Sequence, residues 1–198
     1  MNAVCVFCGS STGRDPSIGD AAEFVGRRIA TRGLGVVYGG AAVGLMGRVA
    51  DGALAAGGSV VGVLPEFFST VEIAHPNLSE LHIVDSMHAR KLLMAQRSDA
   101  FLALPGGLGT FEEFCEVVTW TQIGIHDKPC GLLNVGGFFD PLIAQFDRAA
   151  EAGFLSPEHR GLVIADDEID RLLDRLSTWT RPAGPKWAGT MPDELADR

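Results

Sequence analysis

Short apolar runs alternate with longer amphipathic stretches along most of this chain. The short runs are rich in β-branched and other apolar residues, as buried parallel strands are. They cover residues 3–8, 34–40, 59–65, 81–84, 100–107, 130–134 and 162–166. The longer stretches have helical spacing and cover residues 15–33, 44–58, 86–98, 110–124, 140–153 and 168–179. Residues 66–77 follow neither pattern and are predicted to be irregular.

Strict alternation of strands and helices predicts an α/β fold, a doubly wound, Rossmann-like parallel sheet in a single domain. We place this domain at residues 1–180. The remaining stretch, residues 181–198, is rich in proline and glycine and is expected to be a flexible tail. In such sheets, ligands bind beyond the carboxyl ends of the strands, so the turns from strand to helix are the places to search for a site.

Composition and charge narrow the classes of partner. Hydrophobic residues make up 46% of the 198 residues, a globular composition, and no apolar run reaches the length of a membrane span. The N-terminus lacks the features of a signal peptide, so we expect a cytoplasmic protein. A formal net charge of −9 argues against nucleic acid or an anionic membrane as a partner, although a small phosphorylated ligand needs only one local site.

Cys5 and Cys8 have the spacing of a metal or redox pair, but they fall in a predicted strand. Residues three apart on a strand point to opposite faces, so the two thiols are expected to be separate and buried. Cys115 and Cys130 are the other two cysteines of the chain. No cluster of histidine, cysteine and carboxylate side chains suggests a metal site, and none is predicted.

Glycine clusters follow three of the predicted strands, at residues 8–11, 38–47 and 104–110. Such turns let backbone amides converge on an anion at the start of the next helix, although glycine also serves in any tight turn. The two interpretations are equally good for "YGG". For "LPGGLGT" the phosphate interpretation is favoured, because Thr110 adds a hydroxyl at the helix start. Neither the Walker nor the dinucleotide fingerprint is present, so the pattern indicates a monophosphate site without a metal.

Two charged positions beside these turns need an explanation. Glu113 stands three residues after Thr110, which is the spacing of a capping box, so it either caps the helix or faces a sugar beyond the phosphate. Arg90 and Lys91 fall near a helix N-terminus, where the helix dipole disfavours cations. They indicate either an anionic partner or a solvated helix face.

The segments "SMHARKLLM" and "LPGGLGTFEEFCEVVTWTQIGIHDKPCGLLN" resemble the Lonely Guy (LOG) family of cytokinin riboside 5′-monophosphate phosphoribohydrolases, long mislabelled as lysine decarboxylases. The motif P-G-G-x-G-T-x-x-E is matched from Pro105 to Glu113, and M-H-x-R-K from Met87 to Lys91; "FCGSS" and "GLMG" match as well. The chain departs from the family at Ala41, where a third glycine is usual, which bears on base preference.

The resemblance implies that Arg90 and Glu113 are catalytic and that the protein is a homodimer with its site near the subunit interface. The implied substrate-binding positions are Glu72, Lys91, Gly107, Leu108, Gly109, Thr110, Phe111, Glu112 and Thr119, and the glycine turns add Gly9, Ser10, Gly40 and Gly106.

The implied reaction hydrolyses the N-glycosidic bond of an N6-substituted adenosine 5′-monophosphate, with no cofactor. Glu113 is expected to be ionised by the helix dipole and to activate water, and Arg90 to orient the substrate and hold the Glu113 carboxylate. Three alternatives remain: a general AMP nucleosidase, a non-catalytic carrier of a phosphorylated cofactor, and lysine decarboxylation. The last would need pyridoxal phosphate on one of only three lysines, Lys91, Lys128 and Lys186.

Overall fold

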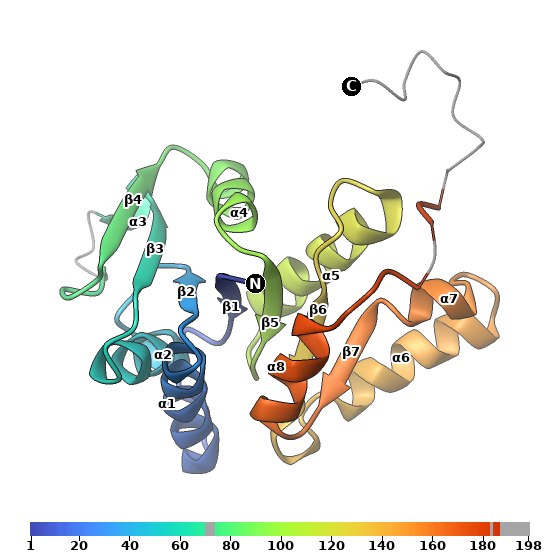
Figure 1. The fold of residues 1–198 in the computed structure, drawn as a ribbon, viewed down its shortest axis with the longest axis horizontal. Helices are drawn as coiled ribbons and strands as arrows, with labels where there is room; N and C mark the ends of the chain where they lie inside the picture. Colours follow the sequence, from blue (N-terminus) through green and yellow to red (C-terminus); the bar gives the residue numbers. More distant parts are fainter. Residues whose placement is uncertain (70–73, 183, 187–198) are drawn as a thin grey trace.

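Seven parallel strands form one sheet in a computed structural model that describes residues 1–69, 74–182 and 184–186. The strands are β1 (Ala3–Phe7), β2 (Gly35–Tyr38), β3 (Val60–Pro65), β4 (Glu80–Val84), β5 (Ala100–Ala103), β6 (Cys130–Leu133) and β7 (Val163–Asp166). Their order is β4-β3-β2-β1-β5-β6-β7, and every pair is parallel. The predicted doubly wound α/β sheet is therefore confirmed (Figure 1).

Helices cover both faces of the sheet. One face carries α1 (Pro16–Thr31), α2 (Gly44–Ala55) and α8 (Ile169–Ser177), and the other carries α4 (Met87–Gln96), α5 (Leu108–Ile123) and α6 (Asp140–Glu151). Cys5 and Cys8 belong to the two opposite core clusters, which confirms that the C-x-x-C spacing does not bring the thiols together.

Local signals explain where several helices begin. Asp15 caps α1 by accepting a hydrogen bond from the Ser17 N–H at 2.9 Å, Pro16 occupies the first turn, and Gly33 follows the helix with a φ of +74°. These features match the sequence prediction. α5 instead begins at Leu108, two residues before the predicted start at Thr110, because the two residues after Gly107 already have helical conformation.

Three short helical elements were not predicted. They are α3 (Glu66–Ser69), α7 (Pro157–Arg160) and the 3₁₀ turn η1 (Val135–Gly137). Each is too short to show a helical period in the sequence. The segment predicted to be irregular thus begins with one turn of helix.

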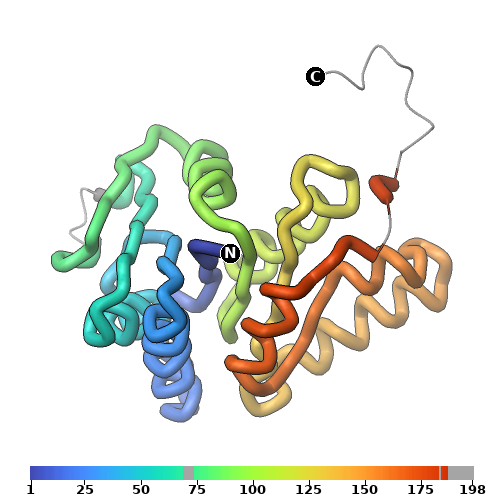
Figure 2. Tube along the Cα trace, in the orientation of Figure 1, coloured from blue at the N-terminus to red at the C-terminus, as the bar shows by residue number. Residues whose placement is uncertain are grey.

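The chain reverses its winding direction at β1. From β1 it proceeds outward to β2, β3 and β4, and then returns to place β5 on the other side of β1. The first half of the chain, blue to green in Figure 2, therefore lies on one side of β1, and the yellow to red half on the other. The three strands that precede the glycine clusters, β2, β1 and β5, are neighbours, so their carboxyl ends meet at one edge of the sheet.

Part of the predicted C-terminal tail, residue 183 and residues 187–198, lies outside the described residues. The part that is described contacts the domain: the Lys186 N–H donates to the Gln122 carbonyl at 2.9 Å, and Arg181 pairs with Asp127. The boundary at residue 180 stays a prediction. Over the described ranges, no helix is both long and apolar enough to cross a bilayer.

Candidate active site

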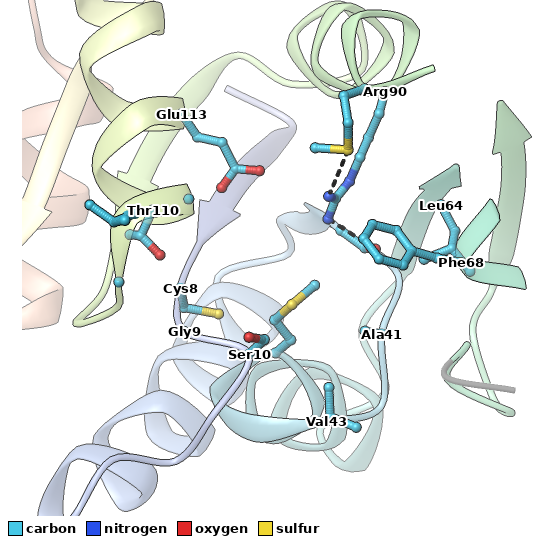
Figure 3. Close-up of a pocket in the computed structure, with 16 residues that line it drawn as sticks. Cys8, Gly9, Ser10, Ala41, Val43, Leu64, Phe68, Arg90, Thr110 and Glu113 are labelled. Atoms are coloured by element: carbon cyan, nitrogen blue, oxygen red, sulfur yellow. Dashed lines mark hydrogen bonds between the residues drawn. The ribbon is translucent and has the colours of Figure 1, made fainter. Parts of the chain in front are cut away.

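A cavity of about 500 Å³ opens at the carboxyl edge of the sheet, where the three glycine turns meet. This volume suits a small organic ligand. The cavity is lined by Cys8, Gly9, Ser10, Gly39, Ala41, Val43, Met46, Leu64, Phe68, Met87, Arg90, Gly107, Leu108, Gly109, Thr110 and Glu113. Figure 3 shows α5 with Thr110 and Glu113 on one wall and α4 with Arg90 on the opposite wall.

The α5 N-terminus reaches this cavity without a protein cap. Gly107 is the N-cap residue, with extended backbone, and it has no side chain to accept from the amides of the first turn. The first backbone bond of the helix runs from the Phe111 N–H to the Gly107 carbonyl at 3.1 Å. The preceding amides therefore have no acceptor within the helix, and they carry the positive end of the helix dipole.

Glycine occurs at three positions of this turn for two different structural reasons. A Cβ at Gly106 would lie 2.1 Å from Thr110 Oγ1 and 2.9 Å from the Gly9 nitrogen, so glycine there lets the first and third glycine turns pack together. A Cβ at Gly107 or Gly109 would meet nothing within 4 Å. Packing within the protein does not require glycine at these two positions, and they leave open space beside the uncapped amides.

The capping-box interpretation of Glu113 is wrong. A capping box joins the N-cap residue to the third residue of the helix. In the structure, Gly107 is the N-cap and Thr110, which is buried, is already the third helical residue. Glu113 is the sixth, too far along the helix to reach the amide of its N-cap. Its carboxylate lines the cavity instead (Figure 3).

Glu113 also differs from the expectation that it is fully ionised. Burial raises the pKa of this carboxyl to about 7; the charges of Arg90 and Lys91 lower it, and those of Glu112 and Glu116 raise it. The helix dipole acts mainly within the first turn, and Glu113 lies beyond that turn. Desolvation therefore outweighs the dipole, and Glu113 exchanges its proton near neutral pH.

Arg90 is held by two main-chain carbonyls, one within β3 and one directly after β2. Its Nε donates to the Val63 carbonyl at 3.1 Å and its Nη2 to the Gly39 carbonyl at 3.2 Å, while Nη1 lies 3.8 Å from Met87 Sδ. The expected contact in which Arg90 holds the Glu113 carboxylate is not formed; the two side chains face each other across the cavity (Figure 3). The carbonyls of Val63 and Gly39 already engage the Nε and Nη2 donors of the guanidinium.

Gly39 makes this arrangement possible. A Cβ at Gly39 would lie 1.8 Å from Arg90 Nη2 and 2.5 Å from Met46 Cε, so any side chain would displace the arginine. The neighbouring Gly40 has a φ of +80° and accepts the His75 N–H at 2.9 Å, and it does not line the cavity. Ala41, the departure from the family pattern, does line it, and its carbonyl accepts from the Tyr38 hydroxyl at 3.2 Å.

Several residues predicted to bind substrate lie away from the cavity. Lys91 pairs with Glu112 and Glu116, and Phe111 packs against Phe138 and Phe139. Thr119 is two turns further along α5 and donates to the Cys115 carbonyl at 2.7 Å. Glu72 lies outside the described residues. Gly106 lines an adjoining hollow with Gly9 and Ser10.

Sequence reasoning missed the apolar lining of the cavity, formed by Val43, Met46, Leu64, Phe68 and Met87. Of these, Met87 and Met46 stand inside recognised motifs, which was a usable signal. The others look like ordinary apolar residues of helices and strand ends, and only their meeting in space distinguishes them. No group of three or more metal-ligating side chains occurs in the described ranges.

The fold defines a Rossmann-like α/β protein, and its cavity lies at the switch in winding direction, where such sheets bind ligands. Residues 46–176 match a family model described as "possible lysine decarboxylase". The chain is 52% identical over 169 residues to the cytokinin riboside 5′-monophosphate phosphoribohydrolase of Rhodococcoides fascians, with 85% of each chain covered. It is 44% identical over 176 residues to LOG1 of Arabidopsis thaliana, which carries the same name, covering 89% of this chain and 83% of that one. The chain belongs to this LOG family of phosphoribohydrolases.

Solved structures with the same fold include a molybdenum cofactor binding protein from Rippkaea orientalis, at 22% identity and a TM-score of 0.69, covering 89% of this chain and 96% of that one. The molybdenum cofactor carrier protein of Chlamydomonas reinhardtii is similar at 21% identity and a TM-score of 0.68, covering 90% and 99%. At these identities the likeness concerns the fold alone.

Proposed function

We propose that this protein hydrolyses the N-glycosidic bond of cytokinin-type nucleoside 5′-monophosphates, releasing the free base and ribose 5-phosphate. The observation that carries the proposal is the placing of an uncapped helix N-terminus, a titrating glutamate and an anchored arginine around one cavity. Relatives at 44–52% identity that are named for this reaction support it.

The phosphate binds at the α5 N-terminus. The free amides at Gly107–Thr110 and the open space at Gly107 and Gly109 suit an anion of this size. With the phosphate there, the ribose extends along α5 toward Glu113, one turn further on. The base then lies against the apolar lining, where Leu64, Phe68 and Met87 offer contacts to an N6-prenyl group.

Glu113 in its ionised form carries out the chemistry. As the bond to the base breaks, positive charge develops on the ribose, and a nearby carboxylate stabilises it. The carboxylate also takes a proton from the water that adds to the anomeric carbon. The base leaves with the bonding electron pair and takes up a proton. Arg90 orients the substrate through the donors that Val63 and Gly39 leave unused.

A product assay tests the proposal. Purified protein is incubated with N6-isopentenyl-AMP, with AMP and with the matching ribosides, and the released bases are separated by chromatography. We expect free base and ribose 5-phosphate from N6-isopentenyl-AMP. Faster turnover of AMP would favour the general nucleosidase, and tight binding without release of base would favour the carrier.

We also propose that the protein is a cytoplasmic homodimer. Four unpaired cysteines suit a reducing compartment. The edge strand β4 exposes Leu81 and Ile83, and the adjacent α4 exposes half of Leu92, which offers apolar surface to a second copy. Light scattering on the wild type and on Ile83→Lys tests the dimer: we expect twice the chain mass for the wild type, and a monomeric wild type would refute it.

A further inference from the structure

An ionic cluster joins α4 to α5 outside the cavity. Lys91 Nζ on α4 lies 2.5 Å from Glu112 Oε1 and 2.9 Å from Glu116 Oε2, both on α5. The lysine side chain is only 9% exposed, whereas Glu112 is 54% exposed. Because the lysine is buried, solvent and salt screen its two contacts less than those of a surface pair, and removing a partner would leave a poorly compensated charge.

The members of this cluster are chain neighbours of the catalytic pair. Lys91 directly follows Arg90, and Glu112 directly precedes Glu113. Glu116 follows Glu113 by three residues, which places the two on neighbouring positions of the same helix. The cluster therefore ties together the two helix segments that present Arg90 and Glu113 to the cavity.

The cluster also supplies much of the charge around Glu113. The charges of Arg90 and Lys91 act on Glu113 from α4, and those of Glu112 and Glu116 act on it from α5. From β1 the neighbours are the thiols of Cys5 and Cys8, which burial keeps neutral by raising their pKa values. Removing a charge from the cluster must therefore change how easily Glu113 gains a proton, with a sign set by the charge removed.

We propose that Lys91 and Glu116 are positioning residues, which with Glu112 fix the place and the charge of the Glu113 carboxylate from outside the cavity. Lys91 thereby acts through Glu113 rather than on the substrate. The inference rests on the proposed role of Glu113.

Two variants with opposite charge changes test it. The pH dependence of kcat/KM reports the protonation of the free enzyme, so its acid limb follows Glu113. We expect Lys91→Met to move this limb to higher pH and Glu116→Gln to move it to lower pH, each on the order of half a pH unit. Lys91→Arg keeps the charge and is expected to leave the limb in place even if kcat falls.

Arg97→Met is the matched control. Like Lys91→Met, it removes one positive charge. Arg97 lies at the C-terminal end of α4, away from the cavity, where it pairs with Glu80. We expect its acid limb to match that of the wild type. The double variant Lys91→Met/Glu116→Gln, which leaves the net charge unchanged, is expected to return the limb toward the wild-type position.

The outcomes separate the possibilities. A raised KM in Lys91→Met together with unmoved limbs in both single variants would make Lys91 a substrate-binding residue and overturn the inference. Lower kcat in both with unmoved limbs would also overturn it, by reducing the cluster to a structural link. If Lys91→Met does not fold, as judged by circular dichroism, Glu116→Gln and Lys91→Arg decide alone. Full activity of Glu113→Gln would instead refute the proposed role of Glu113.

Discussion

Two helix N-termini, those of α4 and α5, lie on opposite walls of the cavity, and they are completed in different ways. α4 is capped by its own chain: Ser86 Oγ accepts the Ala89 N–H at 3.1 Å. α5 begins at Gly107, which has no side chain to offer. The first helix end is satisfied within the protein, whereas the second has no side-chain cap and is the end at which we propose that the phosphate binds. An uncapped helix end beside open space offers its amides to an anion, whereas a capped one offers fewer.

The two helices also place charge differently. α4 carries a cation, Arg90, in its N-terminal half, where the dipole is unfavourable, and the carbonyls of Val63 and Gly39 compensate for this. α5 carries an acid, Glu113, beyond the reach of its dipole, and burial raises the pKa of that acid to about 7. The arginine is therefore anchored by two carbonyls, while the raised pKa of the glutamate allows it to exchange a proton near neutral pH.

The largest expected effect comes from removing the anion that α5 is proposed to bind. A riboside without its 5′-phosphate loses several charge-assisted hydrogen bonds, each worth about 1.5–3 kcal/mol. Two such bonds correspond to a loss of kcat/KM between roughly a hundredfold and ten-thousandfold. Steady-state kinetics on N6-isopentenyl-AMP and its riboside measure this, and similar values for the two would show that α5 binds no phosphate.

Glu113→Gln is expected to lower kcat by at least roughly a hundredfold, the low end for loss of a positioned acid–base group. For the wild type, kcat/KM should fall as the pH drops below about 7, because the ionised form is the active one. A pKa raised by folding means that the ionised carboxyl destabilises the fold, so wild-type stability declines as the pH rises from about 4.5 to about 7 and levels off above that. The Glu113→Gln variant has no carboxyl to ionise, so its stability should not fall in this way.

Thermal unfolding at pH 8 tests whether the ionised Glu113 carboxyl destabilises the fold. Glu113→Gln should be at least as stable as the wild type there, and it should still bind the nucleotide in a calorimetric titration. An active and stable Glu113→Gln protein would make the glutamate dispensable.

Gly39→Ala tests how α4 holds its cation. The added methyl would lie 1.8 Å from Arg90 Nη2, so the guanidinium must leave the Gly39 carbonyl. Because the atoms that must move are ends of flexible side chains, the fold should survive, and kcat/KM should fall by about tenfold or more. Gly19→Ala in α1, where a Cβ meets nothing within 4 Å, is the control and should retain full activity. Equal activity of both variants would show that the position of Arg90 is unimportant.

A smaller effect separates the two helix ends directly. Ser86→Ala removes the α4 cap and should cost about 1 kcal/mol of stability without changing KM. Gly107→Ala removes no cap, but it places a methyl in the open space at α5, so it should raise KM with little loss of stability. Chemical denaturation and kinetics on both variants measure the contrast; a raised KM in Ser86→Ala alone would reverse our assignment of the two ends.

The smallest expected effect is that of chelation. In the described ranges no group of three metal-ligating side chains occurs, and the α5 amides with Arg90 supply the positive potential. Activity should be unchanged after dialysis against a chelator. Loss of activity that added divalent metal restores would require a different site.

Local rules in the sequence were enough for the fold and for the choice of region. The alternation of apolar runs and helical periods predicted every strand and every long helix of the described sheet, because each signal spans at least one full period. Asp15 and Pro16 located the start of α1 for the same local reason. The glycine turns pointed to the edge of the sheet at which the cavity opens, since parallel strands end together.

Only the tertiary structure decided how the candidate site is arranged. The helix start at Leu108 removed Glu113 from the capping box, and burial, which depends on what packs around a residue, raised its pKa. The carbonyls that hold Arg90 come from β2 and β3, and Lys91 meets Glu112 and Glu116 across two helices. Spacing along a chain encodes periodicity and caps, whereas desolvation and contacts between distant segments exist only once the chain has folded.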